Sequence, residues 1–427
     1  MLDIKLIRES PEKVKENLTK RIGFDVSIVD EVLKIDENWK SEKFNLDKLK
    51  SEKNKESKQI AEVKKTGGDI KSQLNKVKEI SELITNQEIE LKEIEKIREK
   101  LLIKIPNLLD NEVPIGADDE ENVQIRINKE KPNYTFKIRN HQELCELNNW
   151  YELDKAAKNS GARFYYLKGE LVMLQFALYN FVMEKLMLKG YTPVEVPPML
   201  RREVLGKSVS LEDFDEAIYE IKGEDLCLIA TSEHALAGLH ADETIANKDL
   251  PIKYAGISQC FRKEAGVTKD EKGIFRVHNF NKIEQFIFAS QEQSDELLEE
   301  LINNAEEIFQ DLELHFRIVD ICSGDIGSFA ARKYDLEAWL PGQDKFREMV
   351  SASNYRDYGA RRLNTRYQNE KNELKLVHTL NSTAIALTRT LIAIIEQHQT
   401  ESGNVVIPEK LRKYFSGRKY LKNVPNE

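Results

Sequence analysis

Apolar residues follow heptad positions along most of the chain between Val32 and Leu108, with one interruption at the sequence KKTGGD. Before the interruption they are Val32, Ile35, Trp39, Leu46, Leu49, Ile60 and Val63, and after it Ile80, Ile84, Leu91, Ile94, Leu101, Ile105 and Leu108. This period is typical of helices that pack along a shared seam. Gly67 and Gly68 supply the backbone freedom that a helix reversal needs. The pattern predicts an antiparallel helical hairpin with its tip near residue 67 and limbs on the order of 50 Å long.

Charge is distributed unevenly over this predicted hairpin. Between Lys43 and Lys78 there are eleven lysines and five acidic residues, whereas the formal net charge of the whole chain is -9. The negative total argues against nucleic-acid binding by the whole surface, but it leaves room for a local basic element. Two interpretations stay open: a solvated coiled-coil surface, or a stiff basic arm that holds a phosphate backbone.

The sequence indicates neither secretion nor membrane insertion. Its first ten residues, MLDIKLIRES, are charged from Asp3 onward and lack the apolar core of a secretory signal. The most apolar stretch, LVMLQFALYNFVMEKLM, is interrupted by Gln175, Asn180, Glu184 and Lys185. We expect this stretch to be too short and too polar to span a bilayer. A cytoplasmic protein without a membrane partner is therefore expected.

Four cysteines, at positions 145, 227, 260 and 322, form no close pair along the chain. This usage fits a reducing cytosol and gives no zinc-type spacing. We expect four ordinary half-buried thiols rather than metal ligands.

The 427 residues predict two or three domains. The stretch IPNLLDNEVPIGADDEEN, with two prolines and an acidic cluster, indicates an exposed linker after the hairpin. From about residue 124 onward, short strand-like and helix-like runs alternate without regular βαβ spacing, which favours an α+β domain on a mixed or antiparallel sheet. We predict a helical arm over residues 1–110, a linker over 111–130 and a second domain over 131–427. Neither GxGxxG nor GxxxxGK[ST] occurs.

Two strand-like runs, GISQCFRKE and IFRVHNFNKIEQFIF, are predicted to form a β-hairpin with one polar face. On the second run, alternate positions place Arg276, His278, Phe280, Lys282 and Glu284 on one face, and Val277, Ile283 and Ile287 on the other. On the first run, Arg262 and Glu264 share a face opposite Phe261. The polar row is either a surface-exposed face or a ligand platform, with arginines for phosphates, an aromatic ring for a base and acids for an amine.

Two further clusters suit such a platform. In KFREMVSASN, Glu348 and Ser351 offer oxygen ligands for Mg²⁺ or a ribose, but their spacing of three requires a bulge or a strand end to place both on one face. In HTLNSTAIALTRTLIAIIEQH, we expect Asn381 and Thr383 at the start of a nearly all-apolar helix. Arg389 in that helix must either pair in the interior or face a ligand.

Together these stretches resemble a known family. GYTPVEVPPML, FRKEAG with FRVHNFNKIEQF, and the helix of Arg389 are similar to motifs 1, 2 and 3 of class II aminoacyl-tRNA synthetases, in order. TSEH at 231–234, FRKEAG, EMVSASN and TLNSTAIALTRT together resemble seryl-tRNA synthetases, most closely the archaeal-like members of the common type. The resemblance spans essentially the whole chain, and it implies that the N-terminal hairpin is a tRNA-binding arm.

The resemblance also implies site residues. For serine they are Thr231, Ser232, Glu233, Arg262, Glu284, Asn381 and Thr383, with Glu284 receiving the substrate amino group or hydroxyl. For ATP they are Arg262, Lys263, Glu264, Arg276, Phe280, Glu348, Met349, Val350, Ser351 and Arg389. Within these sets Arg262, Glu284 and Arg389 are implied as catalytic, and Glu348 and Ser351 as ligands of Mg²⁺. Phe280 and Arg389 would sandwich adenine, and Pro197 would lie at a homodimer interface.

Some positions depart from the family pattern. The motif 2 loop AGVTKDEKG has fewer glycines than the usual AGxxGKDTKG, HNF replaces HQF, and Ala384 and Thr388 stand where many members have glycine. We interpret the two motif 3 changes as a variant. The loop change, from Gly266 to Gly273, bears on closure over ATP and the tRNA acceptor end rather than on ATP binding.

The implied reaction is a two-step ligation of L-serine to tRNA. The serine carboxylate attacks the α-phosphorus of ATP, pyrophosphate leaves, and the seryl group passes to the terminal ribose of tRNA(Ser); whether tRNA(Sec) is also charged stays open. The phosphate charge is offset by arginines and Mg²⁺, so no protein nucleophile is required. A rival hypothesis is a synthetase-like protein without tRNA charging, either a carrier-protein ligase or a regulatory scaffold. The complete arm argues against a carrier-protein ligase, which would have no use for it. A non-catalytic scaffold is disfavoured because a full set of catalytic-site residues is present: Arg262, Glu264, Glu284 and Arg389.

Overall fold

The computed structural model describes residues 1–65, 67, 69–208, 215–264 and 273–421. Residues 266–272 of the motif 2 loop, whose unusual glycine pattern was noted above, lie outside this description. The chain divides into two compact units, Met1–Leu108 and Leu109–Glu427. The predicted boundaries at 110 and 130 remain predictions. The stretch interpreted as an exposed linker is not extended throughout, because Leu109 and Val113 are buried and Val123–Ile127 forms a strand.

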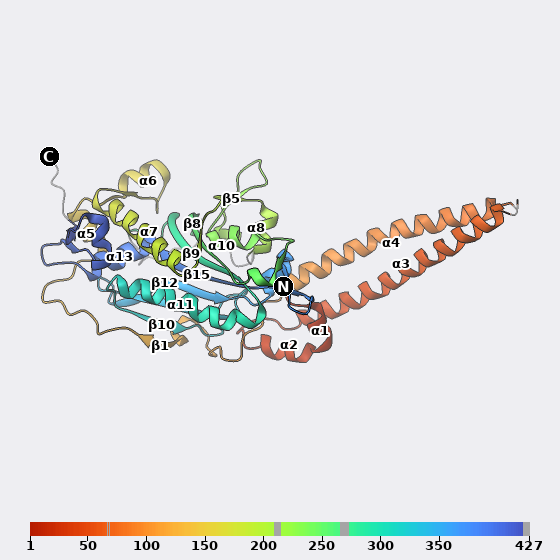
Figure 1. Cartoon of the computed structure of the whole chain (residues 1–427), viewed down its shortest axis with the longest axis horizontal. Helices are drawn as coiled ribbons and strands as arrows, with labels where there is room; N and C mark the ends of the chain where they lie inside the picture. The colour runs from red at the N-terminus through yellow and green to blue at the C-terminus, as the bar shows by residue number, and fades with distance from the viewer. Residues whose placement is uncertain (66, 68, 209–214, 265–272, 422–427) are drawn as a thin grey trace. The chain divides into compact units, whose positions relative to one another are not determined.

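The first unit is built around the predicted helical hairpin. Its helices are α1 (Ile4–Glu9), α2 (Pro11–Leu18), α3 (Ile28–Lys65) and α4 (Lys71–Lys104). The two long helices run side by side in opposite directions (Figure 1). Gly67 between them has φ +73°, a left-handed conformation that glycine adopts without strain. The antiparallel hairpin with its tip near residue 67 is confirmed, and 38 residues at about 1.5 Å each agree with limbs on the order of 50 Å.

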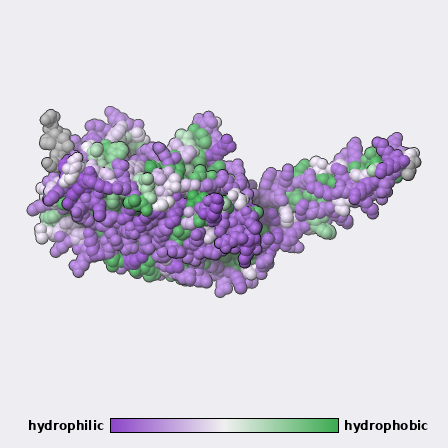
Figure 2. Space-filling model, viewed as in Figure 1, coloured by the Kyte–Doolittle hydropathy of each residue, from purple (hydrophilic) through white to green (hydrophobic). Residues whose placement is uncertain are grey.

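The seam of the hairpin is narrow. Leu46, Ile80, Ile84 and Leu91 form a buried cluster, against which Trp39 and Leu49 pack. Ile105 and Leu108 were predicted on the second limb, but α4 ends at Lys104 and they follow it. Figure 2 shows mainly hydrophilic residues over the visible face of the helix pair, as expected for limbs that share only one apolar stripe.

The second unit contains a mixed, mostly antiparallel sheet of eight strands in the order β1-β10-β11-β12-β15-β9-β8-β4. In chain order these strands are β1 (Val123–Ile127), β4 (Thr192–Glu195), β8 (Ile252–Phe261), β9 (Asn279–Ala289), β10 (Phe316–Asp320), β11 (Arg332–Leu340), β12 (Lys345–Asn354) and β15 (His378–Ala386). Only the β4–β8 pair is parallel within this sheet. The predicted α+β class is therefore confirmed.

The helices described in this unit are α5 (His141–Leu147), α6 (Asp154–Ser160), α7 (Glu170–Leu188), α8 (Arg202–Ser208), α10 (Ser232–Gly238), α11 (Ser294–Asp311), α12 (Tyr358–Leu363) and α13 (Leu387–Gln397). Helices α7, α11 and α13 pack on one face of the sheet and α10 packs on the other. The short strands are β2 (Tyr151–Glu152), β3 (Tyr166–Leu167), β5 (Met199–Leu200), β6 (Cys227–Leu228), β7 (Thr244–Ala246), β13 (Arg366–Gln368), β14 (Leu374–Leu376), β16 (Val405–Val406) and β17 (Tyr420–Leu421). The 3₁₀ turns are Asp119–Glu121, Asp215–Ala217, Asn247–Asp249, Gln291–Gln293 and Glu409–Phe415.

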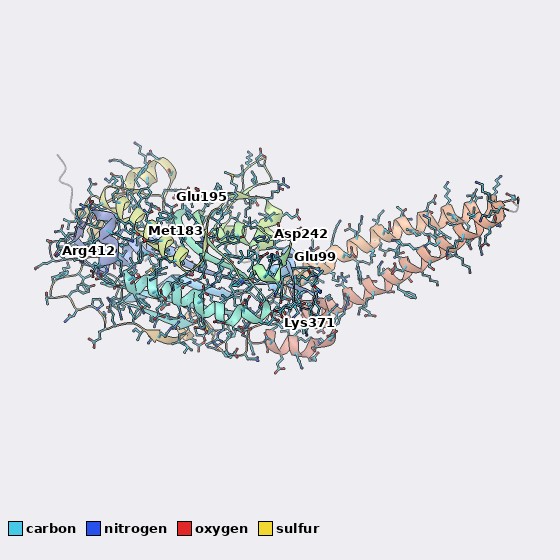
Figure 3. The ribbon with its side chains drawn as sticks, in the orientation of Figure 1. Glu99, Met183, Glu195, Asp242, Lys371 and Arg412 are labelled. Carbon is cyan, nitrogen blue, oxygen red and sulfur yellow. The ribbon has the colours of Figure 1, made fainter. Side chains whose placement is uncertain are left out.

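The main core lies between one face of the sheet and helices α7, α11 and α13 (Figure 1). Helix α7 is long and apolar enough to cross a membrane by composition, but Leu171, Leu174, Leu178 and Val182 pack into this core. Met183, labelled in Figure 3, belongs to the same helix and packs against the same cluster. The apolarity of this face of α7 is therefore explained by its position in the core.

Further predictions about local structure are wrong. Arg262 and Glu264 follow the end of β8 at Phe261, and Arg276 and His278 precede the start of β9 at Asn279, so these four residues lie outside the predicted strands. Asn381 and Thr383 do not begin a helix: residues 378–386 form the central strand β15, and the helix α13 starts at Leu387. The four cysteines are fully buried rather than half-buried, and all four are unpaired. The strand was taken for a helix because a segment buried on both faces shows no polar alternation in the sequence.

Candidate active site

Polar side chains gather on the sheet face opposite the main core, across strands β12, β15 and β9. Residues that pair across neighbouring strands point to the same face of a sheet. Ser353 pairs with Asn381, and Thr383 pairs with Glu284. Because Asn381 and Thr383 are two positions apart on β15, all four side chains lie on one face. These side chains line a cavity of about 280 Å³ together with Thr231, Glu233, Arg262 and Lys282, among others. Apart from Ser232, the predicted serine-site residues are thus brought together in this cavity from four separate parts of the chain.

Glu284 is the most densely hydrogen-bonded group in this cavity. Its side chain is fully buried, and its Oε2 atom accepts hydrogen bonds from the hydroxyls of Thr231 and Ser232 and from the backbone N–H of Glu233, the last two at 2.8 and 3.0 Å. The Oε1 atom accepts from Lys282 at 2.5 Å and from Asn381 at 3.2 Å. Burial alone would raise the pKa of Glu284, but the charge of Lys282 and these hydrogen bonds lower it to about 2.

Glu233 lies beside Glu284 in a different electrostatic environment. Burial and the negative charge of Glu284 raise the pKa of Glu233 to about 7, although a hydrogen bond from Tyr355 opposes the shift. Its Oε2 atom accepts from Asn381 at 2.9 Å, and the Oδ1 atom of Asn381 has no hydrogen-bond partner among the described residues. The cavity therefore contains two different carboxylates. Glu284 is already hydrogen-bonded by groups of the chain, whereas Glu233 is available to a cationic ligand.

A close contact between helix α10 and strand β8 places Glu233 here. Thr231 caps α10 by accepting the N–H of Glu233. Gly256 lies opposite Glu284 on β8, and a Cβ atom at this position would lie 2.6 Å from Leu236 and 2.9 Å from the Ser232 hydroxyl. Glycine at 256 thus lets α10 approach the strand closely enough for its first residues to reach Glu284.

A second cavity of about 200 Å³ adjoins the first. It is lined by Arg262, Glu264, Phe275, Arg276, Val277, Phe280, Lys282, Glu348, Met349, Thr383, Ala386, Thr388 and Arg389. Four residues line both cavities: Arg262, Lys282, Glu348 and Thr383. The second cavity combines aromatic rings with three guanidinium groups, a composition that suits a base attached to phosphates.

The arginines of the second cavity are held by specific partners. Arg276 pairs with Glu264 at 2.7 Å, and the guanidinium of Arg262 lies 5.2 Å from the centre of the Phe280 ring. Arg389 lies 3.4 Å from the Glu348 carboxylate, donates to the Glu348 carbonyl at 2.8 Å and stands 4.9 Å from the centre of the Phe275 ring. Arg389 is therefore both paired and exposed to the cavity.

A β-bulge brings Glu348 and Ser351 to the same face. Leu336 pairs with Val350, whereas the next residue of β11, Glu337, pairs with Glu348, so Met349 is the extra residue. The bulge that the spacing of Glu348 and Ser351 required is confirmed. Surrounding protein atoms partly desolvate the Glu348 carboxylate, which is still 49% exposed, and this would raise its pKa; the charges of Arg389 and other cations outweigh that effect and lower the pKa to about 2.

Comparison with known proteins agrees with this geometry. Residues 1–109 match the seryl-tRNA synthetase N-terminal domain, and residues 217–398 match the class II core domain shared by synthetases for G, H, P, S and T. The serine–tRNA ligase of Pyrococcus horikoshii is 47% identical over 97% of this chain and 96% of its own length. That of Methanoregula boonei is 44% identical over 99% and 100%, respectively.

The chain belongs to the seryl-tRNA synthetase family. A crystal structure of seryl-tRNA synthetase from Pyrococcus horikoshii complexed with ATP superposes with a TM-score of 0.92 at 46% identity, covering 100% of both chains. The cytoplasmic serine–tRNA ligase of Naegleria fowleri in complex with AMP gives 0.87 at 37% identity, covering 99% of both. The resemblance inferred from the motifs is therefore confirmed over the full length.

Some residues implied by the seryl-tRNA synthetase motifs do not line either cavity. Lys263 lies beside Tyr219, with its ammonium group 5.9 Å from the ring centre, and Val350 is buried in the main core. Ser232 contributes indirectly through its hydrogen bond to Glu284. Pro197 is exposed on the segment between β4 and β5. Roles in ATP binding for Lys263 and Val350 would have to involve their backbone.

Sequence reasoning missed several residues of the seryl-tRNA synthetase site. Lys282 was placed on the polar face without a role, and Phe275 was passed over although it precedes Arg276. Tyr355 lines the first cavity and contacts Glu233. Phe275 could have been found from its place in the run IFRVHNF, but Tyr355 reaches the cavity only through the sheet topology, which no local pattern reveals.

Proposed function

We propose that this chain activates L-serine with ATP to form seryl-adenylate and then transfers serine to tRNA(Ser). The observation that carries the proposal is the pair of adjoining cavities with four residues in common. A reaction between an amino-acid carboxylate and the α-phosphate of a nucleotide needs two such sites that meet at the reacting atoms. The ATP bound to the Pyrococcus horikoshii relative supports assignment of the second cavity to ATP.

The geometry suggests how the chain's own residues serve the first step. Glu233 is placed to attract the serine ammonium group, and Arg262 lies where the serine carboxylate and the α-phosphate would meet. The carboxylate attacks the α-phosphorus in line and pyrophosphate departs. Arg262, Arg276 and Arg389 offset the negative charge that develops on the phosphates. The implied role of Glu284 as a direct substrate ligand stays a prediction, because the chain itself supplies five donors to that carboxylate.

The residues around Glu348 fit a magnesium ion. The Glu348 carboxylate and the Ser351 hydroxyl line the same cavity, and both are oxygen donors of the kind Mg²⁺ prefers. Among the described residues, no group of three or more acidic, histidine or cysteine side chains could hold a metal alone. A site that binds Mg²⁺ together with phosphate oxygens needs only one or two protein ligands. When bound there, Mg²⁺ would neutralise phosphate charge.

Selectivity for serine follows from the buried polar groups of the first cavity. The Oδ1 atom of Asn381 has no partner among the described residues, and Glu233 has spare acceptor capacity. We propose that the serine hydroxyl and ammonium groups satisfy them, with Thr231 and Thr383 as neighbours. Alanine would leave one of these groups unpaired, which a site built for a hydroxyl rejects strongly.

We further propose that the helical arm binds tRNA. Among the eleven lysines between residues 43 and 78, only Lys43, Lys50 and Lys76 form ion pairs with described acidic residues. The remaining lysines leave a net positive surface for a phosphate backbone. The same two-step chemistry would charge tRNA(Sec), which we propose as a second substrate.

A homodimer in the cytoplasm completes the proposal. Helix α7 exposes Met173, Phe176, Met187 and Leu188, the last with 84% of its surface accessible, and Pro197 is exposed as well. Large exposed apolar side chains in one helix favour an interface with another molecule. The four buried, unpaired cysteines fit a reducing compartment. Light scattering of the purified protein would give twice the chain mass if the dimer forms.

Serine-dependent exchange of pyrophosphate into ATP tests the central claim. We expect activity with serine far above that with alanine, threonine, glycine or cysteine, followed by charging of tRNA(Ser). A carrier-protein ligase would activate an amino acid without charging tRNA, and a regulatory scaffold would do neither. Preference for glycine or alanine would contradict the assignment of serine.

A further inference from the structure

A buried carboxylate outside both cavities joins three segments of the catalytic unit. Glu396, on the last turns of α13, is fully buried. Its Oε1 atom accepts the backbone N–H of His141 at 2.8 Å and lies 2.9 Å from His141 Nδ1, and its Oε2 atom accepts the N–H of Gly342 at 2.9 Å. Because Oε1 is an acceptor, Nδ1 of His141 carries the proton and donates. Glu396 thus fixes the orientation of the His141 ring.

The opposite edge of that ring touches the backbone of Gly273. Gly273 has φ +73°, and a Cβ atom there would lie 2.2 Å from His141 Nε2 and 2.8 Å from its Cδ2. His141 is itself only 4% exposed. The ring therefore lies directly against the glycine backbone, and its position cannot change without a change at Gly273.

Gly273 leads directly into the nucleotide cavity. Two residues later, Phe275 is 4% exposed and lies under the guanidinium groups of Arg347 and Arg389, 4.4 and 4.9 Å from its ring centre. Arg276 follows and lines the same cavity. Arg389 belongs to the same helix as Glu396, two turns earlier. Helix α13 therefore acts on the cavity in two ways. It supplies Arg389 to the cavity wall, and through Glu396 and His141 it holds the backbone at Gly273.

We propose that His141, oriented by Glu396, is a positioning residue of the ATP site. Its ring fixes the backbone at Gly273 and so places Phe275 and Arg276 for the nucleotide, while contributing nothing to the serine cavity. The inference rests on the proposed function, since it assigns the second cavity to ATP. A residue that only stabilised the fold would affect both substrates alike.

His141→Asn separates positioning from stability. An asparagine amide can replace the Nδ1 donor toward Glu396 but is too short to reach Gly273 as the ring does. In pyrophosphate exchange we expect KM for ATP to rise at least about tenfold, because a displacement of about 1 Å in a positioned group can cost on the order of 100-fold. KM for serine and the melting temperature should stay close to those of the wild type. His141→Gln, which extends toward Gly273, should recover part of the loss.

Two further variants keep the test decisive. Gly273→Ala places a methyl group against the same ring, at a φ of +73° that is strained for alanine, and should also raise KM for ATP selectively; the part of this rise that a second substitution at His141 relieves measures the ring contact. Gln397→Leu is the matched control: Gln397 is buried on the same helix and donates to the carbonyls of His315 and Trp339, away from Gly273. It should lower the melting temperature without a selective effect on ATP.

The outcomes are distinguishable. Unchanged KM for ATP in folded His141→Asn enzyme, or equal rises of KM for both substrates, would overturn the inference. A wild-type enzyme without serine-dependent exchange would instead overturn the proposed function. If His141→Asn fails to fold, selective loss of ATP affinity in Gly273→Ala, partly relieved by a second substitution His141→Ala, supports the contact, and the absence of relief refutes it.

Discussion

Replacing Arg389 by alanine removes three contacts at once: an ion pair with Glu348 at 3.4 Å, a hydrogen bond to the Glu348 carbonyl at 2.8 Å and the stacking on Phe275. It also removes a positive charge from the wall of the proposed ATP cavity. We expect adenylate formation to fall at least about 100-fold, because a positioned charge is lost where phosphate charge develops.

The expected loss of adenylation rate in Arg389→Ala can be compared with the expected loss of folding free energy. A partly exposed ion pair contributes at most about 1 kcal/mol to folding, a hydrogen bond about 0.5–1.5 kcal/mol and a cation over an aromatic ring about 0.5–1 kcal/mol. The folded state should therefore lose no more than about 3.5 kcal/mol. A 100-fold loss of rate corresponds to about 2.7 kcal/mol of transition-state stabilisation, which must come from interactions with the substrate.

Arg317 provides a matched control. It pairs with Glu337 at 2.5 Å and lies 4.8 Å from the centre of the Phe346 ring, so it has the same kinds of partner, but it lines neither cavity. Single-turnover adenylation and thermal melting of both alanine variants give the comparison. If Arg389→Ala and Arg317→Ala show equal adenylation rates, Arg389 is only a structural ion-pair partner and the reasoning fails.

Further predictions concern pH, acid stability and the arm. Because Glu233 has a raised pKa of about 7 and attracts the serine ammonium only when ionised, KM for serine should rise as pH falls through about 7; a constant KM between about pH 6 and 8 would argue against this contact. The pKa of Glu284 is lowered from 4.5 to about 2, so its stabilisation is present above pH 4.5 and lost as pH falls toward 2; acid melting of Glu284→Gln should be flatter over this range than that of the wild type. Glutamine at Lys48, Lys55 and Lys58, which are exposed and form no ion pair with a described acidic residue, should weaken tRNA binding and reduce its salt dependence by up to about one unit of slope per contact, without affecting adenylation. A chain truncated before residue 109 should still form adenylate but transfer serine to tRNA slowly. If the truncated and full-length chains transfer serine at equal rates at sub-saturating tRNA, the hairpin is only a solvated structural element.

The hairpin could be predicted from the sequence because its seam repeats locally and its reversal is marked by glycine. The strand β15 could not, because NSTAIA is buried on both faces and continues into the apolar helix of Arg389. Periodicity cannot separate a buried strand from a buried helix. Asn381 and Thr383 were still assigned to the site, since that assignment rested on the motif and not on the secondary structure.

The opposite pKa shifts of Glu233 and Glu284 could not be predicted from the sequence, for a different reason. Both carboxylates were predicted near serine, but their pKa values depend on Lys282, Tyr355 and Asn381, which arrive from three other positions of the chain. Residue types indicate which chemistry is available. The partners that tune it are set by strand register, which only the structure provides.

The bulge at Met349 changes how strand β12 tolerates mutation. After the bulge the residues that face the cavity have odd numbers, Ser351 and Ser353, whereas before it the cavity residue has an even number, Glu348. Deletion of Met349 would remove the extra residue and leave Glu348 and Ser351 two positions apart on a regular strand, so both would still face the cavity. An inserted residue would instead need a second bulge or turn one half of the strand over. Homologous chains should therefore lose a residue at this point more readily than they gain one.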